Sequence, residues 1–320
     1  MDAKKVISDI LAEKKEIKDV YFVACGGSLV DLYGADYFIK AESSTIHSSF
    51  YTSKEFVLNP PKQLGEKSLA IVCSHSGNTP ETVEAAHMAK DRGAAVITLT
   101  HAAGSGCDND RFIVWVYPWD DDELVLSPMG ITLDLMTELV QQQEGFAGYE
   151  HVKEGLGKIS AIVKAARETV HERTIAFADK YDHASIIYTV GSGANWFQAY
   201  GLAICSLMEM QWMHASYIHS GEYFHGPFEV TEKGVVYYQM MSAGKNRSMD
   251  ERSLKFIKEH TDDYVVVDAV ELGLNAISED VVDYFNPILF YAMSCEYRAA
   301  LAHNRNHPLE TRRYMGKVAY

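Results

Sequence analysis

Basic side chains are scarce in this sequence of 320 residues: 29 lysines and arginines stand against 44 aspartates and glutamates, and the formal net charge is −15. A protein that binds nucleic acid through its phosphates needs lysine and arginine to displace counterions. The charge balance therefore excludes a non-specific nucleic-acid-binding protein. Taken alone, the same balance also argues against an anionic substrate.

Cysteines and long apolar runs are also in short supply. The five cysteines show no CxxC spacing, which predicts reduced thiols and not a disulfide framework. No apolar stretch reaches the ~20 residues of a membrane-spanning helix, and the charged N-terminus lacks the apolar core of a signal peptide. With 47% hydrophobic and 23% charged residues, the composition is typical of a globular protein. We therefore expect a soluble, cytoplasmic protein.

The sequence does contain a regular alternation of short apolar runs and helix-like segments. Runs of this kind occupy residues 20–25, 68–73, 94–100 and 112–117 of the first half. Buried strands that alternate with helices are typical of βαβ units around a parallel sheet. The chain is therefore predicted to be an α/β protein whose parallel sheets are flanked by helices.

The second half repeats this pattern. Runs at 185–190, 235–241 and 264–268 follow their counterparts at a nearly constant distance along the chain, with similar Gly/Ser punctuation after them. Chance spacing in any α/β chain is the alternative, but the matched punctuation favours an internal duplication of a doubly wound, flavodoxin-like unit. We expect the first unit at residues 1–150 and the second, with a C-terminal tail, at residues 151–320.

One motif, Ser74-His75-Ser76-Gly77-Asn78-Thr79, follows a predicted buried strand and opens a helix. Open α/β sheets bind ligands at the carboxyl ends of their strands, and a helix N-terminus there offers unpaired N–H groups. Three hydroxyls in the motif add neutral donors, which predicts a phosphate-binding loop. The alternative is an ordinary helix cap with incidental serines. Because such a loop needs no lysine, the acidic composition does not exclude a phosphorylated substrate.

The apolar segment 199–212 carries a single charge, on Glu209. We expect a helix that is buried on most of its faces. An unpaired carboxylate is costly to bury, and desolvation generally raises the pKa of a buried carboxylate toward the range of a general base. Glu209 is therefore a candidate base, and a structural glutamate held by buried donors is an equal alternative.

A third motif, residues 219–229, places Glu222 and His225 on a loop bounded by glycine and proline. His225 is a candidate acid–base group because histidine titrates near neutral pH. A histidine that only fixes the turn is the alternative. Together with His214 and His219 these residues raise a metal hypothesis, but their spacing matches no common zinc pattern, and we predict no metal site.

These motifs are similar to those of a known family. Gly26-Gly27-Ser28 and the 74–79 motif resemble the sugar-phosphate loops of SIS (sugar isomerase) domains, and the duplicated layout resembles the isomerase half of glucosamine-6-phosphate synthase. Residues 208–229 with the tail 311–315 most resemble the fructosamine-6-phosphate deglycases. Those enzymes cleave phosphorylated Amadori products such as fructoselysine 6-phosphate or 6-phosphofructose-aspartate. The resemblance extends over residues 20–320.

The resemblance implies a role for individual residues. Glu209 is implied as the proton-shuttling base and Lys317 as a lysine near the sugar. His225 is implied as the acid that opens the sugar ring, and it would act in the active site of the neighbouring subunit of a homodimer or dimer of dimers. Glu222 and Arg313 are further substrate-binding candidates. The implied phosphate ligands are Gly26, Gly27, Ser28, Ser74, His75, Ser76 and Thr79. No cofactor, metal, nucleic acid or membrane is implied.

The implied reaction is the hydrolysis of a fructosamine 6-phosphate to glucose 6-phosphate and a free amine or amino acid. Glu209 removes a proton from C1 to give an enaminol and returns a proton at C2, and the resulting C1 imine is hydrolysed. The alternatives are an aldose–ketose sugar-phosphate isomerase and a non-catalytic sugar-phosphate-binding regulator. The sequence does not identify the amine that the sugar carries.

Overall fold

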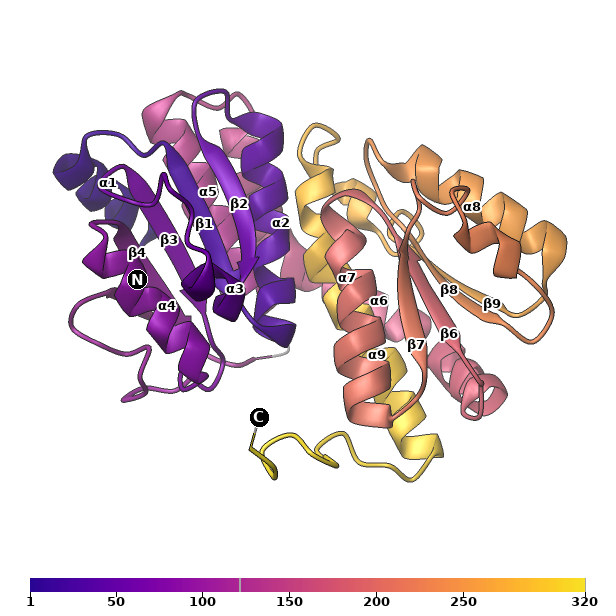
Figure 1. The fold of residues 1–320 in the computed structure, drawn as a ribbon. Coiled ribbons are helices and arrows are strands. Elements are labelled where there is room, and N and C mark those ends of the chain that lie inside the picture. The colour runs from indigo at the N-terminus through magenta and orange to yellow at the C-terminus, as the bar shows by residue number, and fades with distance from the viewer. Residues whose placement is uncertain (121, 320) are drawn as a thin grey trace. The chain divides into compact units, whose positions relative to one another are not determined.

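The computed structural model describes residues 1–120 and 122–319. The chain folds into two compact units, Met1–Gly157 and Lys158–Tyr320. Each unit is built around one parallel sheet (Figure 1). The two helix-flanked parallel sheets confirm the predicted α/β class and tandem architecture. The division falls inside α6 (Tyr149–Tyr181), so the domain boundary expected after residue 150 stays a prediction.

The first sheet has the strand order β2-β1-β3-β4-β5, and all its pairings are parallel. Its strands are β1 (Asp19–Ala24), β2 (His47–Thr52), β3 (Ser68–Cys73), β4 (Ala95–Thr100) and β5 (Ile113–Val116). This is the doubly wound, flavodoxin-like order, in which the direction of winding reverses between β1 and β3.

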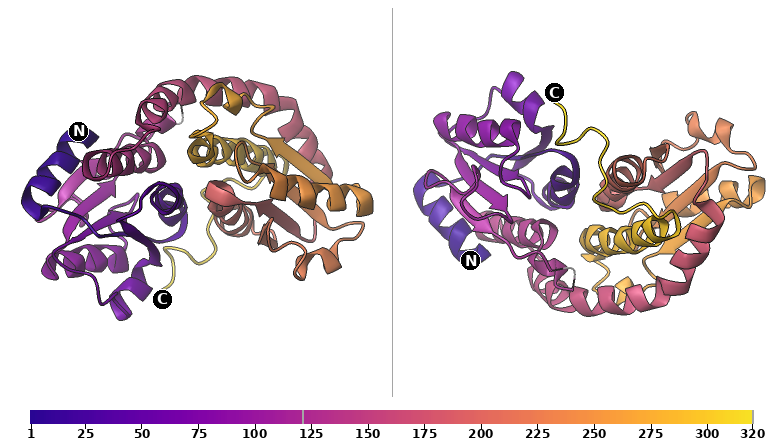
Figure 2. Two further views of the ribbon diagram at one scale, coloured as in Figure 1. Left: turned by 90° about the horizontal axis from the view of Figure 1, so that it is seen from above. Right: turned by 90° about the horizontal axis from the view of Figure 1, so that it is seen from below.

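Helices cover both faces of the first sheet. They are α1 (Ala3–Lys14), α2 (Gly26–Glu42), α3 (Ser53–Leu58), α4 (Pro80–Asp91), α5 (Pro128–Gln143) and the short η1 (Leu124–Leu126). In Figure 2, α1, α2 and α5 lie on one face, and α3 and α4 lie on the other. Alternate strand residues point to opposite faces, so Tyr21, Val23, Ala70 and Val72 pack together with Phe56 of α3.

The second sheet has the order β7-β6-β8-β9, again with parallel pairing. Its strands are β6 (Ile187–Gly191), β7 (Ala215–His219), β8 (Val236–Met241) and β9 (Tyr264–Asp268). The helices that follow α6 are α7 (Trp196–Gly201), η3 (Leu202–Met210), α8 (Arg247–His260) and α9 (Asn286–Asn304), with the short η2 (Gly193–Asn195), η4 (Pro227–Val230), η5 (Leu274–Ala276) and η6 (Val282–Phe285). The order matches the first four strands of the first sheet, as the duplication predicts.

Two strands are not predicted by the apolar runs. β2 contains no buried residue and β7 buries only Ile218. Both lie at the edge of their sheet, where partial exposure permits polar side chains and removes the continuous apolar pattern of a central strand. The sequence therefore predicts the central strands and misses these two edge strands.

Two expectations from the sequence concern cysteine and membrane insertion. All five cysteines are free thiols, as their spacing predicts. Within residues 1–120 and 122–319, no helix combines the length and the apolar character needed to cross a membrane.

The side chain of Glu144 joins the end of α5 to the turn after α2. Its carboxylate accepts hydrogen bonds from the hydroxyls of Ser43, Ser44 and Thr45 and from the backbone N–H groups of Ser44 and Thr45. Burial alone would raise the pKa of Glu144, but these hydrogen bonds outweigh it and lower the pKa to about 2. The charged carboxylate is therefore the form that the fold stabilises.

Replacing Glu144 with glutamine tests this anchor. We expect Glu144→Gln to lower the free energy of unfolding at pH 7 by about 1–2 kcal/mol, because hydrogen bonds to a charged acceptor are lost. The folded pKa lies below the unfolded value of 4.5, so this stabilisation is present above about pH 4.5 and disappears as the pH falls toward 2. Urea unfolding of the wild type and of Glu144→Gln across that pH range measures the difference between their free energies of unfolding. The exposed Glu259→Gln is the control. A difference in the free energy of unfolding that does not change with pH would contradict the role given to the Glu144 carboxylate.

Candidate functional site

The two predicted phosphate-binding motifs lie side by side in the first unit. β1 pairs with β3, with Ala24 opposite Cys73, so the residues that follow both strands leave the sheet at the same edge. The backbone N–H of His75 donates to Oγ of Ser28 at 3.2 Å. The fold therefore brings Gly26-Gly27-Ser28 and the 74–79 motif together at the switch point, where open α/β sheets bind ligands. We call these residues the hydroxyl loops.

The hydroxyls of these loops are not used as helix caps. Neither α2 nor α4 has a side-chain cap, and Oγ1 of Thr79, directly before α4, lies 3.0 Å from Oγ of Ser74. Oγ of Ser76 accepts from the N–H of Asn78 at 3.3 Å. Helix N-termini without a side-chain acceptor attract anions, so this arrangement favours phosphate binding over the alternative of an ordinary cap.

Gly77 fixes the shape of the 74–79 motif. Its φ of +67° lies in the left-handed region, and a Cβ there would lie 1.9 Å from Oγ of Ser105. The side chain of Asn78 accepts from the N–H of Gly106 at 3.0 Å. Residues 105 and 106, which the sequence motifs do not mark, therefore hold the loop in place from the segment after β4.

His75 lies among aromatic rings that the sequence analysis missed. Its Nδ1 is 3.1 Å from the hydroxyl of Tyr117, and its ring stacks on His101 with centroids 5.0 Å apart and meets Trp119 edge-on at 4.7 Å. Burial, together with the neighbouring His101, lowers the pKa of His75 from 6.5. The ring is therefore neutral at neutral pH, and the hydroxyl loops contain no positively charged side chain.

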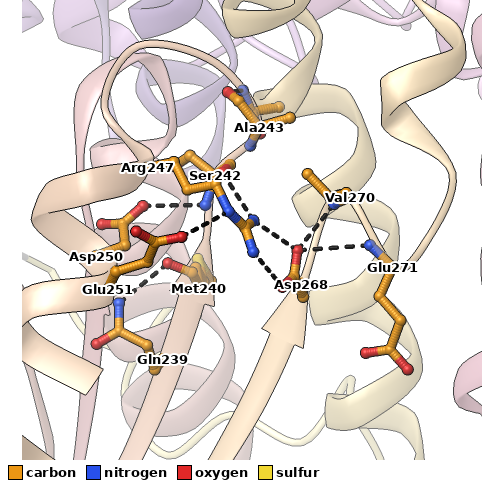
Figure 3. A network of polar contacts seen from close by, with 11 residues as sticks. Gln239, Met240, Ser242, Ala243, Arg247, Asp250, Glu251, Asp268, Val270 and Glu271 are labelled. Atoms are coloured by element: carbon orange, nitrogen blue, oxygen red, sulfur yellow. Dashed lines mark hydrogen bonds and ion pairs between the residues drawn. The ribbon is translucent and has the colours of Figure 1, made fainter. Parts of the chain in front are cut away.

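At the corresponding edge of the second sheet, a carboxylate of the protein itself accepts hydrogen bonds from the residues that follow the strands (Figure 3). Asp250 is fully buried. It accepts from the hydroxyl of Ser192 after β6 at 2.7 Å, from the hydroxyl of Ser220 after β7 at 2.5 Å, and from the N–H of Ser242 after β8 at 2.9 Å. In the second unit, a buried carboxylate thus lies at the sheet edge where the first unit has the hydroxyl loops.

Two further carboxylates complete this network. Arg247, in the first turn of α8, forms a two-pronged pair with Asp268 at 2.8 and 2.7 Å. Burial alone would raise the pKa of Asp268, but the guanidinium outweighs it and holds that pKa below its ordinary value. Asp283 accepts from the N–H of Lys245 at 3.1 Å, and a Cβ at Gly244 would lie 2.3 Å from its Oδ2. The carboxylates at this edge therefore have their partners within the second unit itself.

We expect that replacing the buried carboxylate of Asp250 has a large effect on stability. Asp250→Ala leaves three buried donors without an acceptor, at about 1–3 kcal/mol each, so we expect the free energy of unfolding to fall by about 3 kcal/mol or more. Burial raises the pKa of Asp250, and the serine hydrogen bonds partly offset that shift. Asp250→Asn keeps an acceptor and removes the buried charge, so its cost should be less than half as large. Urea unfolding at pH 7 measures both variants, and equal losses would contradict the network.

Glu209 lies at the end of a widened helix. An ordinary helix is predicted over residues 199–212, but α7 continues as the π-helix η3, and Trp212 beyond it has a φ of +54°. Apolar periodicity does not distinguish a π-helix from an α-helix, because both present one apolar face. Such segments recur at functional sites, where the extra residue per turn redirects side chains.

The expected burial of Glu209 is wrong. Its side chain is 24% exposed, and Oε1 accepts an ion-paired hydrogen bond from Nη2 of Arg312 at 2.8 Å. The partner comes from the C-terminal tail, far away in sequence, so the segment 199–212 alone could not reveal it. Glu209 is therefore a half-buried, paired carboxylate, and its candidacy as a base rests on its surroundings instead of on isolation.

Those surroundings form a pocket of about 480 Å³ within the second unit, a volume typical of small-molecule sites. We call it the Glu209 pocket. Besides Glu209, it is lined by Ile204, Met208, Trp212, Met213, His214, Arg312, Arg313, Tyr314 and Met315. The predicted base and the predicted substrate-binding Arg313 thus share one cavity, and the tail supplies one of its walls.

Three other predicted site residues do not line the Glu209 pocket. Glu222 and His225 are exposed on the turn after β7, where the N–H of His225 donates to the carbonyl of Glu222 at 2.9 Å. Lys317 donates to the carbonyl oxygen of Arg312. The structure therefore brings Glu209 together with tail arginines, and it does not bring His225 or Glu222 to Glu209 within one chain.

The histidines and acids considered for a metal site are not gathered into one. His214 lines the Glu209 pocket, whereas Nδ1 of His219 accepts from the N–H of Gly221 at 3.0 Å. In the part of the chain that the structure describes, no three His, Cys, Asp or Glu side chains are grouped to hold a metal ion.

Comparison with known proteins agrees with the fold. The SIS domain family matches residues 14–136. Fructosamine deglycase FrlB of Bacillus subtilis (strain 168) is 40% identical over 307 residues, which cover 96% of this chain and 94% of that protein. Fructoselysine 6-phosphate deglycase of Escherichia coli (strain K12) is 27% identical over 313 residues, covering 96% and 88%. A solved structure from Salmonella typhimurium LT2, described provisionally as a phosphosugar isomerase, has a TM-score of 0.96 at 38% identity and covers 100% and 96%.

The parallel sheets, the hydroxyl loops and the SIS match define a protein built from tandem SIS units. The likeness to FrlB over nearly the whole of both chains identifies the branch. The chain belongs to the fructosamine deglycase family of SIS-domain proteins, which confirms the resemblance found in the sequence.

Proposed function

We propose that this protein is an enzyme that hydrolyses a fructosamine 6-phosphate to glucose 6-phosphate and a free amine or amino acid. The observation that carries the proposal is the position of Glu209 in a pocket of substrate size, in a chain similar to proteins named as deglycases. Metal independence and a cytoplasmic location are parts of the same proposal.

The hydroxyl loops are the proposed phosphate site. Their donors are the hydroxyls of Ser28, Ser74, Ser76 and Thr79 and the N–H groups at the starts of α2 and α4, all of them neutral. Oriented N–H groups and the positive end of a helix dipole stabilise a phosphate without a full positive charge. This mode of binding suits a chain with a net charge of −15.

Glu209 is the proposed base for the proton transfer between C1 and C2. It takes a proton from C1 of the fructosamine to give an enaminol, and a proton returned to C2 leaves an imine at C1. Water then adds to that imine, and the C1–N bond breaks to release the amine and the aldose 6-phosphate. The ion pair with Arg312 orients the carboxylate before the substrate arrives.

The Glu209→Gln variant tests this role. A positioned base contributes about 10²–10⁴-fold, so we expect kcat to fall by about that factor while KM changes only a few-fold. A coupled assay of glucose 6-phosphate release measures both constants, and the exposed Glu232→Gln serves as the control. If Glu209→Gln retained near-wild-type turnover with an unchanged circular dichroism spectrum, Glu209 would not be the base. Fructose 6-phosphate in a parallel assay separates deglycase from isomerase activity.

We also propose that His225 serves the site of a neighbouring subunit, because its exposed side chain does not line the Glu209 pocket of its own chain. In a two-fold symmetric dimer, a hybrid of His225→Ala and Glu209→Gln subunits then contains one intact site and one doubly altered site. Mixing equal amounts of the two inactive proteins should restore about a quarter of wild-type activity. Sedimentation first establishes the oligomeric state, and hybrids without activity would place His225 in the site of its own chain.

A further inference from the structure

Arg313 is a charged group in the Glu209 pocket that the proposed proton transfer does not use. Its guanidinium lies 4.3 Å from the ring centroid of Trp212 and 6.0 Å from that of Tyr314. Arg312, by contrast, is committed to Glu209 and to the carbonyl oxygens of Leu309 and Thr311. Among the described residues, no carboxylate pairs with Arg313. Its side chain is solvent-exposed on the tail that forms one wall of the pocket, so its guanidinium is accessible to a ligand.

Stacking on Trp212 leaves the N–H donors of the Arg313 guanidinium available for hydrogen bonds to a ligand. The indole occupies one face of the guanidinium, whereas the five N–H donors lie in its plane and point outward from its edge. That edge matches a carboxylate, which accepts two parallel hydrogen bonds from it. Because the stacked ring also restricts the side chain, little conformational entropy is lost when a carboxylate binds.

The rest of the pocket wall suits an aliphatic group. Met208 and Met315 line it and are 43% and 50% exposed, and Ile204 lies beside them. Methionine side chains are flexible and polarisable, so they adapt to apolar groups of different shapes. The pocket therefore offers a carboxylate-binding edge and an adaptable apolar wall next to Glu209.

We propose that Arg313 is the specificity residue that binds the carboxylate of the amino acid carried by the sugar, with Met208 and Met315 against its aliphatic part. The inference rests on the proposed function, because a base that acts at C1 lies next to the nitrogen attached to C1. A group beside Glu209 in the same pocket therefore faces what that nitrogen carries. The new element is the residue: Arg313 makes the rate of cleavage depend on the carboxylate of the adduct.

A pair of substrates that differ only in the carboxylate tests the assignment. The 6-phosphofructosyl adducts of glycine and of methylamine are compared by their kcat/KM values. For the wild type we expect the glycine adduct to be favoured by about 10–100-fold, the range of a hydrogen-bonded charge pair. Arg313→Gln should reduce that ratio to within about threefold, mainly through a higher KM for the glycine adduct. Arg313→Lys, which keeps the charge but loses the two-pronged geometry, should give an intermediate ratio.

A matched control is available in Arg252, which also stacks on an aromatic ring, Phe224 at 4.7 Å, but does not line the Glu209 pocket. Arg252→Gln should preserve the substrate ratio, and circular dichroism verifies the fold of every variant. If the wild type cleaves neither adduct, the proposed function fails. If it cleaves both equally, or if Arg313→Gln preserves the ratio or lowers kcat equally for both, deglycation stands and the carboxylate assignment is overturned.

Discussion

The parallel pairing of β1 with β3 is the constraint on which the first unit depends. The winding of the sheet reverses between these two strands, so the turns that follow them diverge and leave space at the carboxyl edge. Both turns begin helices without side-chain caps, and the space is therefore surrounded by N–H groups and hydroxyls. The proposed phosphate site at this edge follows from the strand order, and the glycines and serines of the hydroxyl loops supply its donors.

The two halves of the duplication treat the same edge in opposite ways. The first unit leaves its hydroxyl loops open to a ligand, whereas the second satisfies its equivalent donors with the buried carboxylate of Asp250. A buried carboxylate that receives three hydrogen bonds holds three chain segments together, which a solvent-filled cradle would not do. In the second unit this sheet edge therefore has a structural role, and the Glu209 pocket lies elsewhere in that unit.

Much of the fold and part of the site could be predicted from the sequence. The central strands of both sheets and the 74–79 motif are marked by local pattern, because complete burial and turn chemistry leave their signs in consecutive residues. The edge strands β2 and β7 are not marked by a local pattern, since their partial exposure permits polar residues. The lone charge in segment 199–212 marked Glu209, and the family resemblance implied a role for Arg313. The Arg312 ion pair, the aromatic neighbours of His75 and the carboxylates of the second unit were missed because they join residues far apart along the chain.

By itself, the sequence determined the α/β class, the duplication and the position of the 74–79 motif, because each leaves a pattern of short runs that can be read along the chain. Only the tertiary structure decided that Glu209 is half-buried and paired, that Arg313 lies on Trp212, and that Asp250 receives the hydrogen bonds of the serines in the second unit. The net charge of −15 illustrates the difference. As a composition it argues against anions, but binding depends on which groups meet at one place, and folding brings neutral donors to the hydroxyl loops and arginines to the Glu209 pocket.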